Sequence, residues 1–380
     1  MITSYLWLGV VFVGAGIALV YSILIFYSIY CWRRLPLVSI PRDFQPNTFI
    51  SVIVPARNEV ANIGACITSL RVQSYPAHLF EIIVVDDHST DATAAIAAAA
   101  GATVLSLGVG WGGQKKGAIT FGIAQARGPW IAATDADCTV PVDWLRMMAW
   151  QIDKGDESVI LAGAVSFSKE KNLLERFQSL DMLGMMVLTG AGIYSQKLLL
   201  CNGANLAYAK EAFTSVGGFA GNDDRASGDD MFLMQKLVGR FPGQIAFLKH
   251  PYGAVSTQAI PTLSGFIAQR LRWASKMDSF RTRWMLVYTG IPFVLSWALL
   301  LTLAALPLLG AKGMELAMGL FLVKAIPDYF LLREATRFYS RKDLMLFFLP
   351  SQLLHLLYMA GVGLASFFVK RYSWKGRKLE

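Results

Sequence analysis

Long apolar stretches stand near both ends of the chain, and a region of short apolar runs lies between them. No charged residue occurs from Met1 to Trp32, a stretch longer than the roughly 20 residues that a helix needs to cross a bilayer. A second uncharged stretch begins at Met285 and ends before Lys312, and a third covers 344–369 with His355 as its one basic residue. Residues 314–332 are also apolar, but their charged residues make them a weaker span. The pattern predicts one membrane span before the central region and two or three after it.

The central region alternates short apolar runs with amphipathic stretches. This alternation is typical of an α/β domain with a mainly parallel sheet. One helix is expected over 92–100, with Asp91 as its N-cap and Gly101 as its C-cap. Another is expected to hold Pro141 in its first turn and to end near Asp153. The expected strands are 50–55, 82–86, 103–107, 130–134 and 159–162.

Composition supports a membrane protein. The net charge is +9 and the mean hydropathy is +0.45, and the basic residues gather beside the apolar segments, where anionic lipid headgroups would meet them. We therefore expect membrane lipids as partners and no nucleic acid. Arg33 and Arg34 follow the first span, which predicts an outside N-terminus and a cytoplasmic central region. The four cysteines show no paired spacing, so neither a disulfide framework nor a zinc site is predicted.

The side on which the C-terminus lies is open at this point. Three C-terminal spans would place the basic tail outside, against the tendency of Lys and Arg to stay in the cytoplasm. Two spans would bring the tail inside but leave Arg337, Arg341 and Lys342 outside.

Acidic residues follow several expected strands, at the edge where parallel sheets bind ligands. Asp135 and Asp137 come directly after the fourth strand, and alternation along an extended segment would put both carboxylates on one side. Clustered carboxylates favour a cation among them, and oxygen ligands favour Mg²⁺ or Mn²⁺. A lone Asp-x-Asp would indicate only a solvated turn. The other residues at these strand ends are Pro55, Ala56 and Glu59 after the first strand, and Asp86 and Asp87 after the second.

A glycine-rich stretch follows the third strand. Gly108, Gly110 and Gly113 match G-x-G-x-x-G, so an NAD-dependent dehydrogenase is an alternative function. That fingerprint normally follows the first strand of its unit, and it would leave the acidic groups unexplained. A flexible loop would explain the glycines structurally. Lys115 comes next and begins an expected helix, whose start would attract a phosphate.

A second acidic pair lies at 229 and 230, within the sequence Ser-Gly-Asp-Asp-Met-Phe-Leu. This sequence predicts a loop that enters a helix, and capping of that helix alone would account for Asp229 and Asp230. The functional alternative is a general base that takes a proton from an attacking hydroxyl. Asp223 and Asp224 lie in a polar, glycine-containing stretch nearby that indicates an exposed loop.

Residues 264–284 mix aromatic and basic side chains directly before an apolar span. Phe266, Trp273, Phe280 and Trp284 fall near one helical face, which predicts a helix in the membrane interface. Contact with lipid does not explain the sequence Gln-Arg-Leu-Arg-Trp at 269–273.

Taken in order, these motifs resemble the inverting family 2 glycosyltransferases over about 48–284. The resemblance is to the membrane-embedded branch with cellulose, chitin, hyaluronan and poly-N-acetylglucosamine synthases and ceramide glucosyltransferase. It implies a GT-A-type nucleotide-sugar-binding domain with Mg²⁺ or Mn²⁺ as cofactor. The expected domain organisation is a transmembrane anchor over 1–34, a cytoplasmic catalytic domain over 48–260, an interfacial helix over 261–284, and a transmembrane region with a basic tail over 285–380.

The resemblance also implies roles for single residues. Asp230 would be the catalytic base, with Asp229 in place of the family's glutamate. Asp135 and Asp137 would hold the donor and the metal, and Thr120 stands where the family has asparagine. The nucleotide-sugar would be bound by Pro55, Ala56, Glu59, Asp86, Asp87, Lys115 and Asp135, and the diphosphate and acceptor by Gln269, Arg272 and Trp273 of a QxxRW motif.

The expected activity is transfer of a sugar, with inversion, from a nucleotide-sugar donor such as a UDP-sugar to a lipid-linked or glycan acceptor. The expected location is the cell membrane, with several spans and a cytoplasmic catalytic domain. A processive polysaccharide synthase of the same branch is an alternative. A non-catalytic binding protein is another, but it would require the acidic set to be incomplete, and every expected acid has a counterpart here.

Overall fold

The computed structural model describes residues 2–108, 110–111, 115–155, 157–221, 228–277, 282–368, 372–374 and 377–379. The chain forms two compact units. The helical unit comprises Met1–Arg34, Lys171–Ala191 and Ile260–Lys370. The α/β unit comprises Leu35–Glu170, Gly192–Ala259 and Arg371–Glu380. Of the positions discussed above, Gly113, Asp223, Asp224, Ser227, Phe280 and the tail residues 370, 371 and 375 lie outside the described residues.

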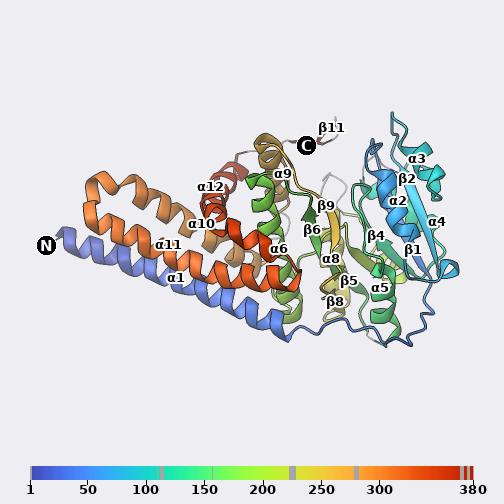
Figure 1. The fold of residues 1–380 in the computed structure, drawn as a ribbon, viewed down its shortest axis with the longest axis horizontal. Coiled ribbons are helices and arrows are strands. Elements are labelled where there is room, and N and C mark those ends of the chain that lie inside the picture. The colour runs from blue at the N-terminus through green and yellow to red at the C-terminus, as the bar shows by residue number, and fades with distance from the viewer. Residues whose placement is uncertain are drawn as a thin grey trace. The chain divides into compact units, whose positions relative to one another are not determined.

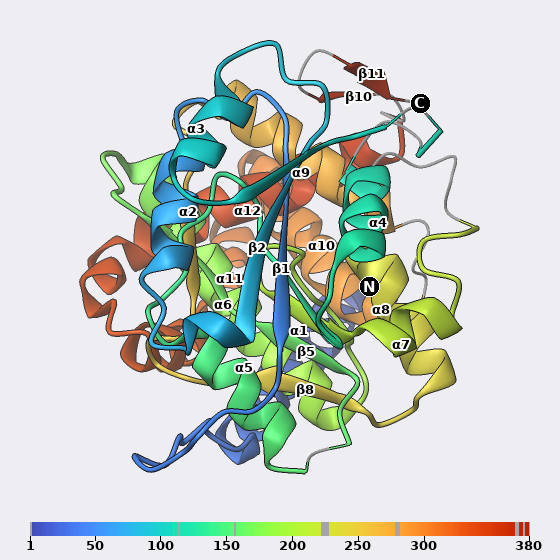
Figure 2. The same cartoon turned by 90° about the vertical axis from the view of Figure 1, so that its right-hand side faces the viewer.

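The α/β unit is built on a seven-stranded sheet in the order β3-β2-β1-β4-β7-β5-β8. Neighbouring strands are parallel except that β7 runs antiparallel to β4 and β5. Figure 2 shows β1 and β2 side by side. The predicted mainly parallel sheet and all five predicted strands are therefore confirmed. The strands are β1 (Ile50–Ala56), β2 (Phe80–Asp86), β3 (Thr103–Ser106), β4 (Trp130–Ala133), β5 (Ile160–Gly163), β7 (Leu206–Ala209) and β8 (Ile245–Leu248), with β6 (Val165–Ser168) and β9 (Val255–Gln258) paired separately.

The core of this unit forms where apolar strands meet helices. Val52, Ile53 and Val54 of β1 are fully buried, as expected for a strand covered on both faces. Gly122 lets α4 approach the sheet closely, because a Cβ there would come within 2.9 Å of the Ile53 side chain. The helices of this unit are α2 (Ile63–Arg71), α3 (Thr93–Ala99), α4 (Lys115–Gln125), α5 (Trp144–Asp153), α7 (Lys210–Ser215) and α8 (Asp229–Arg240).

Three local predictions about helix ends need correction. The N-cap position of α3 is Ala92, although the carboxylate of Asp91 accepts the Thr93 N–H at 3.0 Å. Its C-cap is Ala100, and Gly101 follows with φ of +94°, which glycine adopts without strain. Pro141 precedes α5 and does not lie in the first turn of that helix. The carbonyl of Pro141 accepts the Trp144 N–H in a separate turn.

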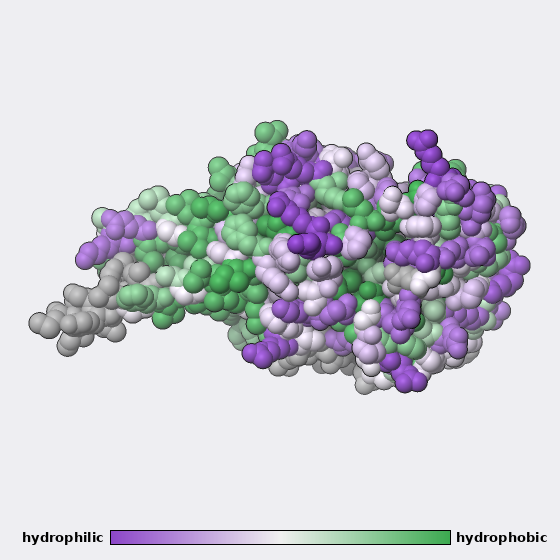
Figure 3. Space-filling model, turned by 90° about the horizontal axis from the view of Figure 1, so that it is seen from below, coloured by the Kyte–Doolittle hydropathy of each residue, from purple (hydrophilic) through white to green (hydrophobic). Residues whose placement is uncertain are grey.

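The helical unit contains α1 (Ile2–Arg34), most of α6 (Leu173–Ser195), α9 (Leu263–Met277), α10 (Arg283–Ala304), α11 (Leu306–Phe338) and α12 (Phe348–Ser366) (Figure 1). Four helical segments in the described part of the chain are long and apolar enough to cross a membrane, one N-terminal and three C-terminal. This finding settles the number of C-terminal candidates at three. Hydrophobic residues cover much of the visible surface of these helices (Figure 3).

Two boundaries in this unit differ from the prediction. The apolar stretch that begins at Met285 is divided, since α10 ends at Ala304 and α11 starts at Leu306, with Pro307 in its first turn. The interfacial helix ends at Met277, and Trp284 belongs to α10. The weaker span over 314–332 lies inside α11, where its charged residues Lys324 and Asp328 form an ion pair of 2.7 Å.

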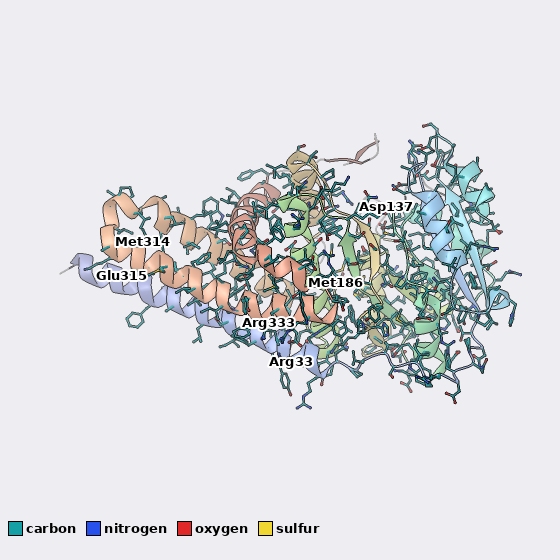
Figure 4. All side chains as sticks on the ribbon, viewed as in Figure 1. Arg33, Asp137, Met186, Met314, Glu315 and Arg333 are labelled. Carbon is teal, nitrogen blue, oxygen red and sulfur yellow. The ribbon has the colours of Figure 1, made fainter. Side chains whose placement is uncertain are left out.

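Helices α1 and α11 run parallel. Tyr21 of α1 donates a hydrogen bond to Asp328 of α11, and twelve residues further along α1 Arg33 pairs with Glu334 at 2.7 Å. Figure 4 shows Arg33 and Arg333 toward one end of this helix group, and Met314 and Glu315 toward the other. The basic C-terminal ends of α1 and α11 therefore lie on the same side.

Candidate functional site

The predicted acidic strand ends do meet at one edge of the sheet. Strand β1 lies between β2 and β4, and all three are parallel. Ala56 is in register with Asp86, and Ile53 with Ala133, two residues before Asp135. The sheet edge therefore collects the ends of β1, β2 and β4, as ligand sites in open parallel sheets require.

The loops after β1 and β2 are tied to each other by hydrogen bonds. Arg57 donates to the backbone oxygen of Asp87 at 2.6 Å, and the side chain of Asn58 accepts the Thr90 N–H at 2.8 Å. Asn58 and His88 both have positive φ, of 50° and 57°. Asp86 and Asp87 are buried at the start of the second loop. These hydrogen bonds hold the two loops in a fixed arrangement at the edge of the sheet.

Arg57 was not among the predicted site residues. Its place directly after a predicted strand was a signal that sequence reasoning could have used, because residues at that end of a parallel sheet line ligand sites. It lies 3.9 Å from the carboxylate of Asp87.

Asp135 and Asp137 lie in a turn and not in an extended segment. The Cys138 N–H bonds to the Asp135 carbonyl at 3.0 Å, and this turn still brings both carboxylates together. Three side chains here could each offer one ligand atom to a metal, namely Asp135, Asp137 and Cys138. These three atoms lie within 4.8 Å of one another. The position of Asp137 is labelled in Figure 4.

The carboxylates of this turn repel one another. Although part of the Asp137 side chain reaches solvent, the protein atoms crowded around it and the charges of Asp135 and Glu59 raise the pKa of its carboxyl. A divalent cation would relieve that repulsion. The two carboxylates therefore fit Mg²⁺ or Mn²⁺, whereas the pKa of the buried Cys138 thiol is raised, which keeps it protonated and disfavours it as a ligand.

Lys115 lies among the same carboxylates. It begins α4, as predicted, and its ammonium group forms an ion pair with Asp135. Burial lowers the pKa of Lys115, but Asp135, Asp230 and Asp229 outweigh that effect and raise the pKa above its usual range. Its neighbour Lys116 lies 4.0 Å from Asp229. Lys115 therefore carries a positive charge into the centre of the acidic cluster.

Asp229 and Asp230 form the first turn of α8, as predicted. The two carboxylate oxygens of Asp230 accept the N–H groups of Gly203 and Met231, each at 2.9 Å. These bonds orient the carboxylate, and each oxygen keeps a further lone pair for a substrate hydroxyl. Gly203 also lies beside Lys115, because a Cβ atom added to Gly203 would be 3.4 Å from the ammonium nitrogen of Lys115.

Helix α9 carries Gln269, Arg272 and Trp273 and belongs to the helical unit. The acidic residues described above belong to the α/β unit. Arg270 is the residue of this segment that sequence reasoning passed over. Its side chain is buried, and the ring centre of Trp273 lies 4.4 Å from its guanidinium carbon.

Known proteins resemble both the sequence and the fold. Residues 51–217 match the profile of the family described as Glycosyl transferase family 2. A beta-monoglucosyldiacylglycerol synthase of Synechocystis sp. is 27% identical over 63% of this chain and 50% of that protein. The glycosyltransferase AglE of Haloferax volcanii is 31% identical over 36% of this chain and 46% of that protein. The matches thus span about half the length of these relatives.

A solved structure supports the fold alone. Mannosyltransferase PcManGT from Pyrobaculum calidifontis, in complex with GDP-Man and Mn²⁺, is similar over 95% of this chain and 98% of that one, with a TM-score of 0.56 and 17% identity. The sheet topology and the likeness to this structure identify a GT-A fold, and residues 51–217 resemble a glycosyltransferase family 2 domain in sequence.

Proposed function

We propose that the protein is a membrane-bound, metal-assisted, inverting glycosyltransferase that moves a sugar from a nucleotide-sugar to a hydroxyl of a lipid-linked or glycan acceptor. The observation that carries the proposal is the gathering of Asp135, Asp137, Lys115 and Asp230 around one site. A donor diphosphate needs cations, and an attacking hydroxyl needs a base. This group offers both.

The donor occupies the braced edge of the sheet in this proposal. Asp86 and Asp87 accept hydrogen bonds from the nucleoside, beside Pro55 and Ala56 at the end of β1. The sequence resemblance favours a UDP-sugar, while the solved mannosyltransferase is named with GDP-Man. Both nucleotides therefore belong in the first test.

Asp135 and Asp137 would hold Mg²⁺ or Mn²⁺, with Glu59 close to Asp137. A bound ion supplies charge neutralisation for the donor diphosphate. Lys115 adds a positive charge of the protein's own at the same place. Asp230 takes the proton from the acceptor hydroxyl, with Asp229 beside it, and the hydroxyl displaces the nucleoside diphosphate from the anomeric carbon in one step. Gln269, Arg272 and Trp273 contact the diphosphate and the acceptor.

A lipid acceptor is favoured over a growing polysaccharide. The named relatives include three beta-monoglucosyldiacylglycerol synthases, and the described part of this chain has four candidate spans with no further set to enclose a polymer channel. The proposed location is the cell membrane, with several spans and the catalytic domain in the cytoplasm. A processive synthase of the same branch is the alternative that an acceptor screen would reveal.

The test is release of nucleoside diphosphate from a panel of UDP- and GDP-sugars by the detergent-purified full chain, with Mn²⁺, with Mg²⁺ and with chelator. Metal-dependent release is expected, and Asp230→Asn is expected to reduce it by about 100-fold or more because a general base is lost. The matched control is Asp143→Asn, which changes another aspartate at a helix start, that of α5. Equal activity of Asp230→Asn and wild type would refute the base, and silence across the panel with NAD binding would favour the dehydrogenase alternative.

A further inference from the structure

The helix that carries the proposed diphosphate and acceptor residues is held at two points by α6. Near its start, the side-chain amide of Gln178 on α6 donates to the Ile260 carbonyl at 2.8 Å and accepts the Ile260 N–H at 3.1 Å. Gln178 is completely buried, and Ile260 lies three residues before α9. Both hydrogen-bonding groups of one backbone position are thus fixed by one side chain.

The second point lies one helical turn further along α6. Asp181 is 2.9 Å from the guanidinium of Arg270, in a contact whose angle is outside hydrogen-bond geometry, so the attraction is mainly electrostatic. The exposed fractions of the two side chains are 11% and 3%. Residues three apart lie on the same helix face, so Gln178 and Asp181 present one surface of α6 to α9.

Aromatic rings complete the contact. Phe177 of α6 packs against Phe266 of α9, with ring centres 5.9 Å apart, and Phe266 packs against Tyr358 of α12 at 5.6 Å. Arg270 stacks on Trp273, one of the proposed acceptor residues. A change at Asp181 would therefore reach Trp273 through a single intervening side chain.

We propose that Gln178 and Asp181 of α6 are positioning residues, which fix α9 and thereby the orientation of Gln269, Arg272 and Trp273. The proposal rests on the proposed function, because these three residues are its diphosphate and acceptor contacts. Gln178 and Asp181 touch neither donor nor acceptor in it. They act through Ile260 and Arg270. A displacement of about 1 Å at a reacting group can cost about 100-fold in rate, so loss of either anchor is expected to reduce turnover.

The test compares Asp181→Asn and Gln178→Leu with Asp328→Asn in the full-length protein in detergent. Asp328 is a matched control, because it too belongs to a buried ion pair of the helical unit, but its partners Lys324 and Tyr21 lie on α11 and α1. Two readouts are used. The first is amide hydrogen exchange across Leu263–Met277, and the second is kcat and KM for donor and acceptor.

Both α6 variants are expected to speed exchange across α9 and to lower kcat/KM by about 10- to 100-fold, whereas Asp328→Asn leaves exchange in α9 at the wild-type rate. Asp181→Glu, which keeps the charge, is expected to recover part of the loss. Should Asp181→Asn fail to fold, Gln178→Leu carries the test. Wild-type exchange across α9 in the α6 variants would overturn the inference, while an inactive wild type would overturn the proposed function instead.

Discussion

The ionised side chain of Asp137 lowers the stability of the folded protein when no cation is bound. Its pKa is raised by its protein surroundings and by Asp135 and Glu59, and a group with a raised folded-state pKa stabilises the protein at low pH and loses that contribution as pH rises through the pKa. At neutral pH the ionised form therefore opposes folding. Residues selected for such a site commonly trade stability for function.

Asp137→Asn is accordingly expected to raise the Tm in chelator while it removes metal-dependent donor turnover. Differential scanning fluorimetry with and without Mn²⁺ measures the first effect. Asp91→Asn is the control of opposite sign, because hydrogen bonds from Thr93 lower the pKa of Asp91 and its charge favours the folded state. A lower Tm in both variants would show that Asp137 has only a structural role.

At the scale of elements, one carboxylate ties the start of β1 to the chain leading into β4. Glu81 accepts hydrogen bonds from Ser51 at 2.6 Å and from the Arg127 N–H at 2.7 Å. Burial alone would raise its pKa, but these bonds and the Arg127 charge outweigh it and lower the pKa. The stabilisation is thus present above the unfolded-state pKa and is lost as pH falls.

Glu81→Gln is expected to lower the free energy of unfolding at pH 7, measured by urea titration, by less than about 1 kcal/mol because the pair is partly solvent-screened. The difference between variant and wild type should shrink as the pH falls below the ordinary range of glutamate, because Glu81 then becomes protonated in the wild type as well. A difference that does not change with pH would mean that the carboxylate charge contributes nothing to this contact.

Helix α11 contains a backbone break that only glycine accepts without strain. Gly310 has φ of +56° and ψ of −138° inside the helix. Gly310→Ala is expected to cost about 1–3 kcal/mol, seen as a lower unfolding temperature in detergent. Gly319 of the same helix has open space at its Cβ, so Gly319→Ala is expected to be neutral or stabilising by up to about 1 kcal/mol. Equal effects at the two positions would contradict this account.

At the scale of the whole molecule, the parallel arrangement of α1 and α11 bears on membrane topology. Arg33 in the last turn of α1 and the basic residues at the end of α11 lie on the same side, and the charge rule assigns that side to the cytoplasm. Arg371–Glu380 belongs to the same compact unit as the acidic site residues, so this assignment also places the C-terminus in the cytoplasm. A chain in which α11 did not cross would place these two basic groups on opposite sides.

This topology predicts that a membrane-impermeant maleimide labels a cysteine added at the N-terminus, before α1, in intact cells. It labels Asp343→Cys, whose side chain is 62% exposed between α11 and α12, only after the membrane is opened. The four native cysteines are buried and provide a low background. Labelling of Asp343→Cys in intact cells would reverse the orientation.

The sequence by itself determined the α/β class, the five predicted strands and the residues that follow them. Local pattern suffices there, because strand identity and the first residues after a strand depend on near neighbours. It also located α4 and α8 with Lys115 and Asp230 at their starts. The number of C-terminal candidate spans stayed open, because buried Lys324 and Asp328 made one of them look too polar until their pairing was seen.

Only the tertiary structure decided which distant residues meet. The pairing of Lys115 with Asp135, the bracing of Asp87 by Arg57, and the contacts of α6 with Ile260 and Arg270 join positions about 20 to 90 residues apart in sequence. No local pattern reports such contacts, because they depend on how whole elements pack. The chemistry of the site could be listed from the sequence, but its order in space came from the packing of the sheet and helices.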